Sequence, residues 1–395
     1  MKRYWKILTV CLVTVIVLGT FYIQSSLASE NIQIDFEKVS GDESLVKSLE
    51  INADYVVGDI HQSLLISDEE TTNLSNRSVV QQLTGLYGEA STQKLVKNYK
   101  QFMRGKNLVS SNFYEDEDLL VYVSVKGKSI NATSLNSFFD IDVLDKKSET
   151  STPMKLDLPK NGKYNWVDIV DIQIKDGKLL VIARGYRING GEDLVVYTVD
   201  LNGKKITNEE VVFSTPAVEN GWSDFRFIND HYSSQPQKYL LFKAEAFEHE
   251  SGDGATAIVD DFMIYDIEQN KMSKIERPEN FAGYIEDSSV LNSALYIPVQ
   301  TPNEVDVIQY DIETKKWDKK QTFGVETPNS SEDVPFVKLQ GGKIYIVYST
   351  NDGHTLSIGD LNTGETLYEG HLKVENSKTE REDYQLYIFE IKDAR

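Results

Sequence analysis

From residue 108 to residue 373 the chain repeats one unit, which consists of a strand, a tight turn, a strand, a loop, a strand, a tight turn and a strand. The clearest copy spans 167–213, with apolar segments at 170–174, 178–182 and 194–201. Asp176-Gly177 and Asn202-Gly203 separate paired segments, and both dipeptides favour the positive φ values of a type I′ hairpin turn. The unit therefore predicts a sheet of four antiparallel strands.

Further copies of this unit are degenerate but keep the same phase. Second strands are predicted to begin near Leu119, Lys178, Lys238, Ala294 and Lys343. Third strands, most of which end in an aspartate, are predicted over 138–142, 196–200, 263–266, 308–311 and 357–360. A four-stranded unit repeated in this way predicts an all-β propeller with five visible blades, because radial repetition leaves only short sheet edges.

The recurring third strand resembles the third strands of bacterial β-propellers of the Kelch and quinoprotein-like kind. The resemblance covers residues 108–373 and implies a propeller fold. The Trp-Asp signature at the third-strand end and the paired glycines of Kelch repeats are absent, so neither family's function carries over. The chain as a whole looks like an uncharacterised, membrane-tethered extracytoplasmic protein of Gram-positive type.

A final strand at 384–391 has no partner nearby in the sequence. Because an open edge invites aggregation, we expect this strand to pair with strands from 32–66 and to form a sixth blade shared by both termini. The propeller domain is thus predicted over 29–395. It contains a helical hairpin over 78–104, in which Ser91 caps the second helix. We expect the apolar stripes of this hairpin to pack on the β body.

Residues 1–28 read as an export signal or a single-span anchor. Basic residues precede an uncharged run over 7–23, which nearly spans a bilayer core of about 30 Å as a helix. Ser26-Leu27-Ala28 fits a cleavage site. We therefore expect a single-pass protein of the cell membrane with an extracytoplasmic C-terminal domain, or a secreted protein cleaved near Ala28.

The net charge of −21 restricts the partners of such a domain. It excludes nucleic acid and disfavours anionic surfaces, so that partners should be cationic or neutral groups or metal ions. Solubility alone also accounts for most of this charge. Membrane contact is expected through the N-terminal segment only. Cys11 is the single cysteine, so one chain forms no disulfide.

Acidic residues recur just before the predicted innermost strands, two of them beside a tryptophan. The candidates are Trp166 and Asp168, Trp222 and Asp224, Glu286 and Asp287, and Glu332 and Asp333. Since the first strand of each propeller blade lines the axis, we expect these groups to converge at one mouth of the channel. Such a cluster suits Ca²⁺, with Asp168, Asp224, Asp287 and Asp333 as ligands, or it is relieved by an arginine or water. The alternative is that acids open strands because they favour turns and solvent.

Two further features carry weaker signals. His231 lies in a loop that could face a mouth of the channel. Residues 245–261 mix His249 with several carboxylates, but they lack EF-hand spacing and are predicted to form a polar loop. The sequence has no serine elbow and no phosphate-binding glycine loop.

Three functions remain open from the sequence. The first is an extracytoplasmic binding, sensory or scaffold module for a protein or cell-envelope ligand. The second is an envelope-acting lyase or hydrolase, with Asp168 and Asp224 as acid and base. The third is an accessory subunit that joins a membrane complex through its helical hairpin.

Overall fold

The computed structural model describes residues 9, 12–14, 32–58, 60–74, 90–131, 134–159, 162–228, 234–249, 255–278, 281, 285–301, 303–325, 334–351, 353–375 and 384–393. The apolar run over 7–23 lies almost wholly outside these residues. In the part of the chain that is described, no helix has the length and apolar character needed to cross a membrane.

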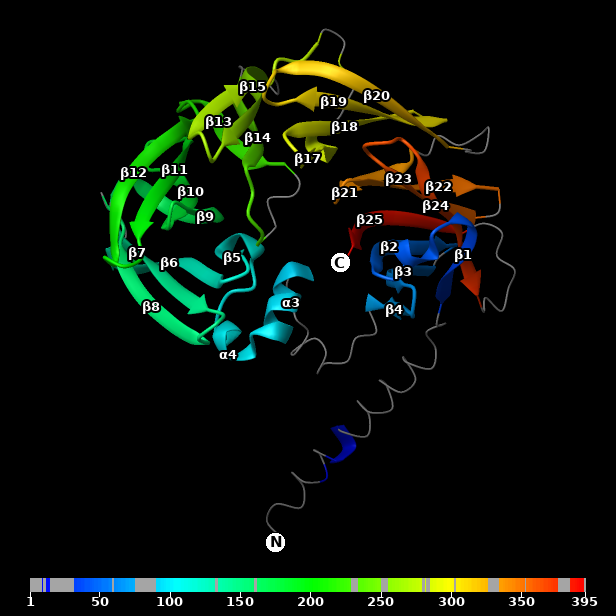
Figure 1. The fold of residues 1–395 in the computed structure, drawn as a ribbon, viewed down its shortest axis with the longest axis horizontal. Coiled ribbons are helices and arrows are strands. Elements are labelled where there is room, and N and C mark those ends of the chain that lie inside the picture. Colours follow the sequence, from blue (N-terminus) through cyan, green and yellow to red (C-terminus); the bar gives the residue numbers. More distant parts are fainter. Residues whose placement is uncertain are drawn as a thin grey trace.

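Antiparallel β-sheets make up most of the described chain, and they stand side by side around a central axis (Figure 1). This agrees with the predicted all-β, propeller-like architecture. The first three sheets after the helices have four consecutive strands each. They are β5 (Phe113–Glu115), β6 (Leu119–Asn131), β7 (Ser134–Asp145) and β8 (Thr150–Asp157); β9 (Tyr164–Lys175), β10 (Lys178–Arg187), β11 (Glu192–Asp200) and β12 (Lys205–Ser214); and β13 (Gly221–Phe227), β14 (Tyr239–His249), β15 (Ala255–Asp266) and β16 (Lys271–Lys274).

The remaining sheets complete the ring. The first holds β17 (Ser289–Leu291), β18 (Ala294–Gln300), β19 (Glu304–Asp311) and β20 (Lys316–Gly324); the second holds β21 (Phe336–Gln340), β22 (Lys343–Thr350), β23 (Gly353–Asp360) and β24 (Thr366–Glu375). Each predicted second strand is present and begins at or next to the predicted residue.

Both ends of the chain take part in closing the ring. The C-terminal strand β25 (Gln385–Asp393) pairs with β2 (Leu49–Val57), which continues into β3 (Ile60–Ser67) and β4 (Thr71–Asn73). The predicted pairing of the last strand with an early strand is therefore confirmed. The early strand β1 (Gln33–Gly41) does not join this sheet, however, because it pairs with β24 as a fifth strand of the preceding sheet.

In five of the six described sheets, the third strand ends in an aspartate that has a structural role, whereas β3 ends at Ser67. Asp311 Oδ1 accepts hydrogen bonds from the backbone N–H and the hydroxyl of Thr314, at 2.6 and 2.8 Å, and Lys315 then takes a positive φ. The corresponding aspartates close the same turn in the other sheets; they are Asp145, Asp200, Asp266 and Asp360. Asn202-Gly203 belongs to this turn type, so the predicted type I′ turn there is wrong, whereas Asp176-Gly177 has both φ values positive as predicted.

The sheets pack face to face, and most core clusters are shared by two neighbouring sheets. Phe139 of β7 meets Tyr197 of β11 edge to face, with 5.1 Å between ring centroids. The helices α3 (Ala90–Asn98) and α4 (Lys100–Met103) are different, because Leu95, Phe102 and Met103 pack on the β5–β8 sheet. This confirms the predicted docking of the second helix. Ser91 lies inside α3 and is not its cap, and the first predicted helix lies outside the described residues.

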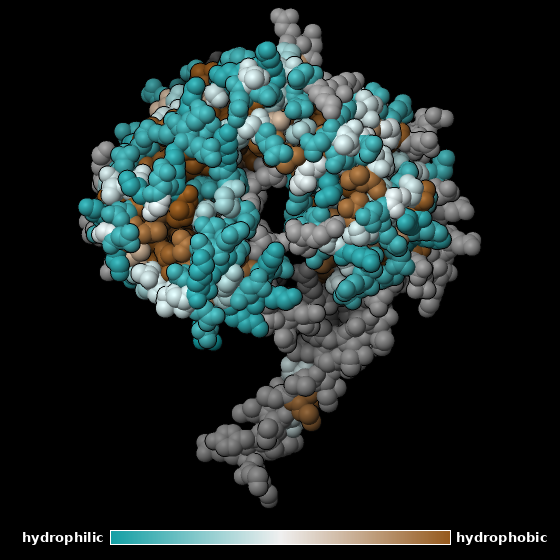
Figure 2. Space-filling model, in the orientation of Figure 1, coloured by the Kyte–Doolittle hydropathy of each residue, from teal (hydrophilic) through white to brown (hydrophobic). Residues whose placement is uncertain are grey.

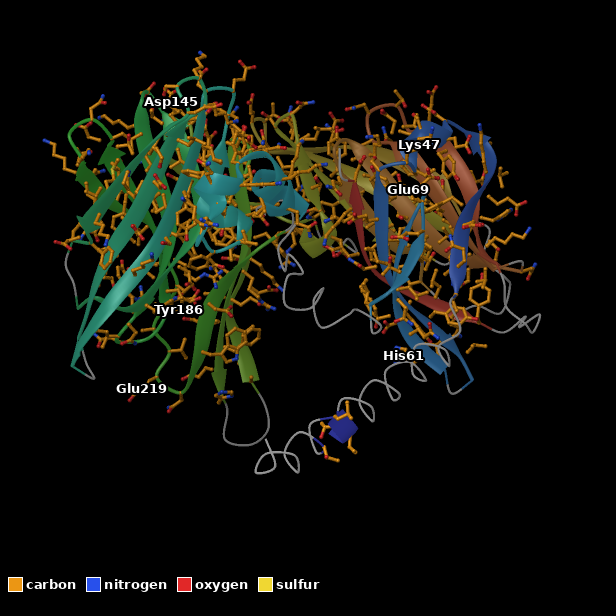
Figure 3. All side chains as sticks on the ribbon, turned by 90° about the horizontal axis from the view of Figure 1, so that it is seen from below. Lys47, His61, Glu69, Asp145, Tyr186 and Glu219 are labelled. Atoms are coloured by element: carbon orange, nitrogen blue, oxygen red, sulfur yellow. The ribbon has the colours of Figure 1, made fainter. Side chains whose placement is uncertain are left out.

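The ring has two faces (Figure 3). Tyr186 and Glu219 lie at one face, which we call the lower face, and His61 lies on the same side. Asp145, Lys47 and Glu69 lie at the opposite face. Seen along the axis, the molecule is hollowed at its centre, and most of the coloured surface around the hollow is hydrophilic (Figure 2). This matches the excess of acidic residues in the sequence.

Candidate functional site

A cavity of about 350 Å³ lies on the inner side of the β5–β8 and β9–β12 sheets. Its walls come from the segment between α4 and β5, from β6, from the first half of β9, from the end of β10 and from Phe227 of β13. The residues that matter for its chemistry are Ser111, Asn112, Ser124, Trp166, Asp168, Arg184 and Tyr186. Trp166 and Asp168 were candidates from the sequence.

The cavity exists because the innermost strand of one sheet is cut short. β5 pairs with β6 only from Leu120 to Tyr122, although β6 continues to Asn131. Ser124 lies just beyond this pairing and lines the cavity. Its side chain is buried, and its Oγ has no hydrogen-bond partner among the described residues. A buried hydroxyl without a partner is costly, so this atom is a prepared contact for a polar group.

Four side chains form a continuous polar chain along the cavity. The Trp166 indole N–H donates to Asp168 Oδ1, and the Tyr186 hydroxyl donates to Asp168 Oδ2 at 3.2 Å. Arg184 donates to the Tyr186 hydroxyl at 3.5 Å. The polar edge of Trp166 is thereby fixed by Asp168, while the side chain as a whole stays 49% exposed. An aromatic ring held by its edge in this way keeps a face free for a ligand.

Carboxylates from two sheets meet at Arg184. Its Nε lies 3.8 Å from the buried carboxylate of Glu192 on β11, and its guanidinium lies 4.7 Å from the centroid of Phe225 on β13. Burial raises the pKa of Glu192, Arg184 lowers it in part, and the charges of Asp224 and Asp168 raise it further. The charges of Asp168 and Asp224 therefore both act on Glu192, while their convergence with the other acids at one mouth of the channel stays a prediction. Arg184 supplies the positive charge that relieves them.

Asp224 lies at the junction of the β9–β12 and β13–β16 sheets. Its Oδ1 is buried and has no partner among the described residues. Burial raises the pKa of Asp224, although Arg226 and Arg184 oppose this and Glu245 adds to it. Trp222, two residues earlier on β13, is 40% exposed and packs against Phe247 of β14 with 4.9 Å between centroids. Trp222 does not line the cavity.

The other acidic candidates are not brought to this site. Asp287 lies in the 3-10 helix η4 (Ile285–Asp287), which contacts β18 and β21 on other sheets. The side chain of Glu286 and all of His231, Glu332 and Asp333 lie outside the described residues. Within the described ranges, no group of three or more histidine, cysteine, aspartate or glutamate side chains could hold a metal ion. Ca²⁺ at Asp168, Asp224, Asp287 and Asp333 therefore stays a prediction.

Two predictions about local structure are corrected. Trp166, Asp168, Trp222 and Asp224 lie within the inner strands β9 and β13 and not in the connections before them. Residues 245–261 are mostly strand, because β14 and β15 are long enough to carry Glu245 and Asp260 as opposite partners. Glu245 is held there by Arg226 and by Lys243 at 2.9 Å, so this carboxylate is paired on the strand.

Arg184, Tyr186 and Glu192 are site residues that sequence reasoning missed. They sit on second and third strands, which usually belong to the interior of a blade. One signal was present, because Arg184 directly follows the apolar run 179–183 in the same strand. A charged side chain in such a strand must find a partner. The walls from Ser111, Asn112 and Ser124 carry no sequence signal of their own.

No family model and no curated protein matches the sequence. Solved structures that resemble the fold include the propeller domain of the Trilobed protease from Pyrococcus furiosus, at 11% identity over 93% of this chain and 98% of that one, with a TM-score of 0.32. A prolyl endopeptidase matches at 10% identity over 87% of this chain and 49% of that one, with a TM-score of 0.31.

The polysaccharide lyase Uly1 is also among the similar structures, at 12% identity over 63% of this chain and 57% of the lyase, with a TM-score of 0.36. Similarities of this size carry no inference about what the chain binds or converts. The ring of antiparallel sheets is of the β-propeller kind by its own topology, and no family is shown.

Proposed function

We propose that this chain is an extracytoplasmic six-bladed propeller that binds a cell-envelope component in the cavity beside Trp166. The observation that carries the proposal is the combination, in one cavity, of the unpartnered Ser124 Oγ, the half-exposed Trp166 and the bonded chain from Arg184 to Asp168. A concave site with few placed polar groups and an aromatic wall is the usual form of a ligand site.

The basic N-terminus and the apolar run over 7–23 support export, with a tether to the membrane or cleavage near Ala28. The acidic body supports a partner that is neutral or cationic. A module of this kind brings its ligand to the membrane surface without altering it, in a sensory or scaffold role.

Blocking the cavity from its rim tests this proposal. Val109 lines the cavity and is 37% exposed, so Val109→Trp fills the opening without disturbing the core. Val211, on the outermost strand of the neighbouring sheet, is 39% exposed and provides the matched control Val211→Trp. The immobilised full-length proteins are incubated with separated protein, glycan and lipid fractions of the cell envelope.

We expect one fraction to be retained by the wild type and by Val211→Trp and to be lost with Val109→Trp. Equal retention by all three proteins, or retention by none of them, would contradict the proposal. Thermal unfolding of each variant checks that the body stays folded.

A second candidate function is acid–base catalysis near the cavity. It is favoured by the carboxyls of Glu192 and Asp224, which lie close to Arg184 and whose pKa values burial raises above their ordinary values. Incubation with envelope glycans and assay for new reducing ends would detect hydrolysis. Activity that is lost in Asp224→Asn but kept in Asp157→Asn, an exposed carboxylate of β8, would favour this role over binding.

A further inference from the structure

The chemistry of the cavity wall restricts the class of ligand, and this step rests on the proposed binding function. The wall charges are one guanidinium, Arg184, and one carboxylate, Asp168. They are linked through the Tyr186 hydroxyl, so each charge is already balanced inside the site. A ligand with a net charge would upset this balance in a partly enclosed space, where unpaired charge is costly.

The surroundings disfavour an anion in particular. Glu192 and Asp224 lie close enough to Arg184 for their charges to be coupled, and the whole chain carries −21. A phosphate or a carboxylate ligand would have to compete with these groups for Arg184. Phe225 already covers one face of the guanidinium at 4.7 Å. The Arg184 position is therefore suited to orienting Tyr186 and donating to neutral oxygens.

The rest of the cavity wall offers uncharged hydrogen-bonding groups. Ser124 Oγ is buried and without a partner among the described residues, and Asn112 is also buried. Ser111 donates its hydroxyl to the backbone carbonyl of Ile169 at 3.2 Å, so its oxygen keeps lone pairs for accepting. These groups both donate and accept. A ligand that matches them must carry several hydroxyl or amide groups around its edge.

Trp166 supplies the complementary apolar surface. Its edge is fixed by Asp168, whereas the side chain is half exposed and lines the cavity. A sugar ring has an apolar C–H face and a rim of hydroxyls, so it can place the face on the indole and the rim on the serine and asparagine side chains. The volume of about 350 Å³ is at the small end of ligand pockets, which are typically about 300–1,000 Å³.

We propose that the cavity binds a neutral saccharide unit, stacked on Trp166 and hydrogen-bonded to Ser124 and Asn112. Asp168 and Tyr186 hold the tryptophan in place and are positioning residues. The ligand is recognised by one or a few sugar rings, and a longer glycan extends from the cavity along the lower face of the ring, where Tyr186 lies (Figure 3).

Periodate oxidation tests this proposal on the envelope fraction whose retention depends on Val109. Periodate cleaves vicinal diols and so opens the sugar rings that carry them, while it leaves most lipids intact; 1,4-linked N-acetylhexosamine rings lack such a diol, and competition by chitotriose tests these. We expect retention by the full-length protein, kept in a detergent without a sugar headgroup, to be lost after periodate treatment. Neutral trisaccharides such as chitotriose, maltotriose and xylotriose are added as competitors, and trigalacturonate serves as an anionic competitor of the same size.

Variants locate the contact. Trp166→Leu should weaken binding about tenfold or more, whereas Trp222→Leu, which removes a comparably exposed tryptophan outside the cavity, should leave it unchanged. Ser124→Ala should weaken binding without altering the fold.

Two results would overturn the saccharide assignment and leave the binding function standing. One is Val109-dependent retention that survives periodate and is displaced by none of the neutral trisaccharides, and the other is competition by trigalacturonate that equals or exceeds competition by every neutral sugar. Equal loss of binding in Trp166→Leu and Trp222→Leu would overturn the stacking on Trp166. If no fraction is retained in a Val109-dependent way, the binding function itself fails.

Discussion

Ser48 donates a hydrogen bond of 2.7 Å to the carboxylate of Asp393, which lies 345 positions later in the chain. The same carboxylate accepts from the Tyr345 hydroxyl at 3.2 Å, and its Oδ2 lies 3.9 Å from Lys343 Nζ. Tyr345 and Lys343 belong to β22 of the neighbouring sheet. The Asp393 side chain at the end of β25 therefore joins this strand both to the segment before β2 and to β22 of the neighbouring sheet.

Asp393→Ala should destabilise the protein, because it removes an acceptor shared by Ser48 and Tyr345. Hydrogen bonds of this kind contribute about 1–3 kcal/mol when a charged group is involved, so we expect a loss of that order in the free energy of unfolding. Urea denaturation measures it. Asp157→Ala, at an exposed position of β8, should change the free energy by less than about 0.5 kcal/mol. Equal effects of the two substitutions would show that Asp393 has no special role in closure.

Asp171 should make the protein less stable as the pH rises. This carboxyl on β9 is fully buried and accepts from Gln173 at 2.7 Å, and burial raises its pKa to about 7 from an ordinary value of 3.8. Between these two pH values the folded protein keeps a proton that the unfolded chain has released. The free energy of unfolding contributed by this group therefore falls from about pH 4 to about pH 7 and then levels off.

Asp171→Asn keeps the hydrogen bond from Gln173 and removes the titration. We expect the variant and the wild type to be equally stable near pH 3, and the variant to be more stable by on the order of a few kcal/mol at pH 8. Urea unfolding at several pH values gives the difference. A difference between the two proteins that stays constant with pH would contradict this assignment.

Asp193 should act in the opposite sense. Burial alone would raise the pKa of this β11 side chain, but hydrogen bonds from Lys163, Ser214 and Tyr164 outweigh burial and hold the pKa below its ordinary value. Arg187 adds an ion pair at 2.7 Å. The stability that this network gives is present above about pH 4 and is lost as the pH falls through the lowered pKa.

Asp193→Asn leaves two cations near a buried site without their carboxylate. We expect a loss of about 3–5 kcal/mol at pH 7 and a smaller loss at low pH, where the wild-type carboxylate is itself protonated. Denaturation at pH 7 and pH 3 compares the two conditions. A loss that grows toward low pH would rule out the charged network as its source.

Lys106 should hold the helices on the β5–β8 sheet and, through them, one wall of the cavity. Its ammonium lies 3.7 Å from the centroid of the Phe102 ring, donates to the Phe102 carbonyl and donates to Asp142 at 2.8 Å. Lys106→Met keeps the aliphatic packing and removes these polar contacts. We expect faster hydrogen exchange in α3 and α4 and unchanged exchange in β9–β12. Uniformly faster exchange across the sheets would mean that Lys106 stabilises the whole ring.

The repeat in the sequence predicted the strands well because it has a direct physical cause. Aspartates such as Asp311 and Asp360 recur since each one binds backbone N–H groups of the turn to the fourth strand. The partner of the last strand was also predictable, because an unpaired edge needs a neighbour. The place of β1 was not, since residues 33–41 carry no signal that marks β24 as their partner.

The site was predictable only where it lies on an inner strand. Trp166 and Asp168 stood out because an acid and a tryptophan recur in phase, and the structure places both at the cavity. Asp287 shared that phase but lies in η4 beside β18 and β21, because a shared phase places each residue at its own sheet and does not by itself bring it next to Asp168. Ser124 becomes a site residue because β5 is too short to cover it. The residues of β6 beyond this pairing carry no sequence signal that the neighbouring strand ends early.

The pairing of β2 with β25 also sets an order of events during biosynthesis. Ser48 and Asp393 are 345 positions apart. The ribosome therefore makes the strands of the other sheets before it makes β25, which is the partner of β2. The nascent protein therefore carries one exposed sheet edge, that of β2, until β25 has been made. Until then, that edge is a site at which a second polypeptide can pair by β-strand addition.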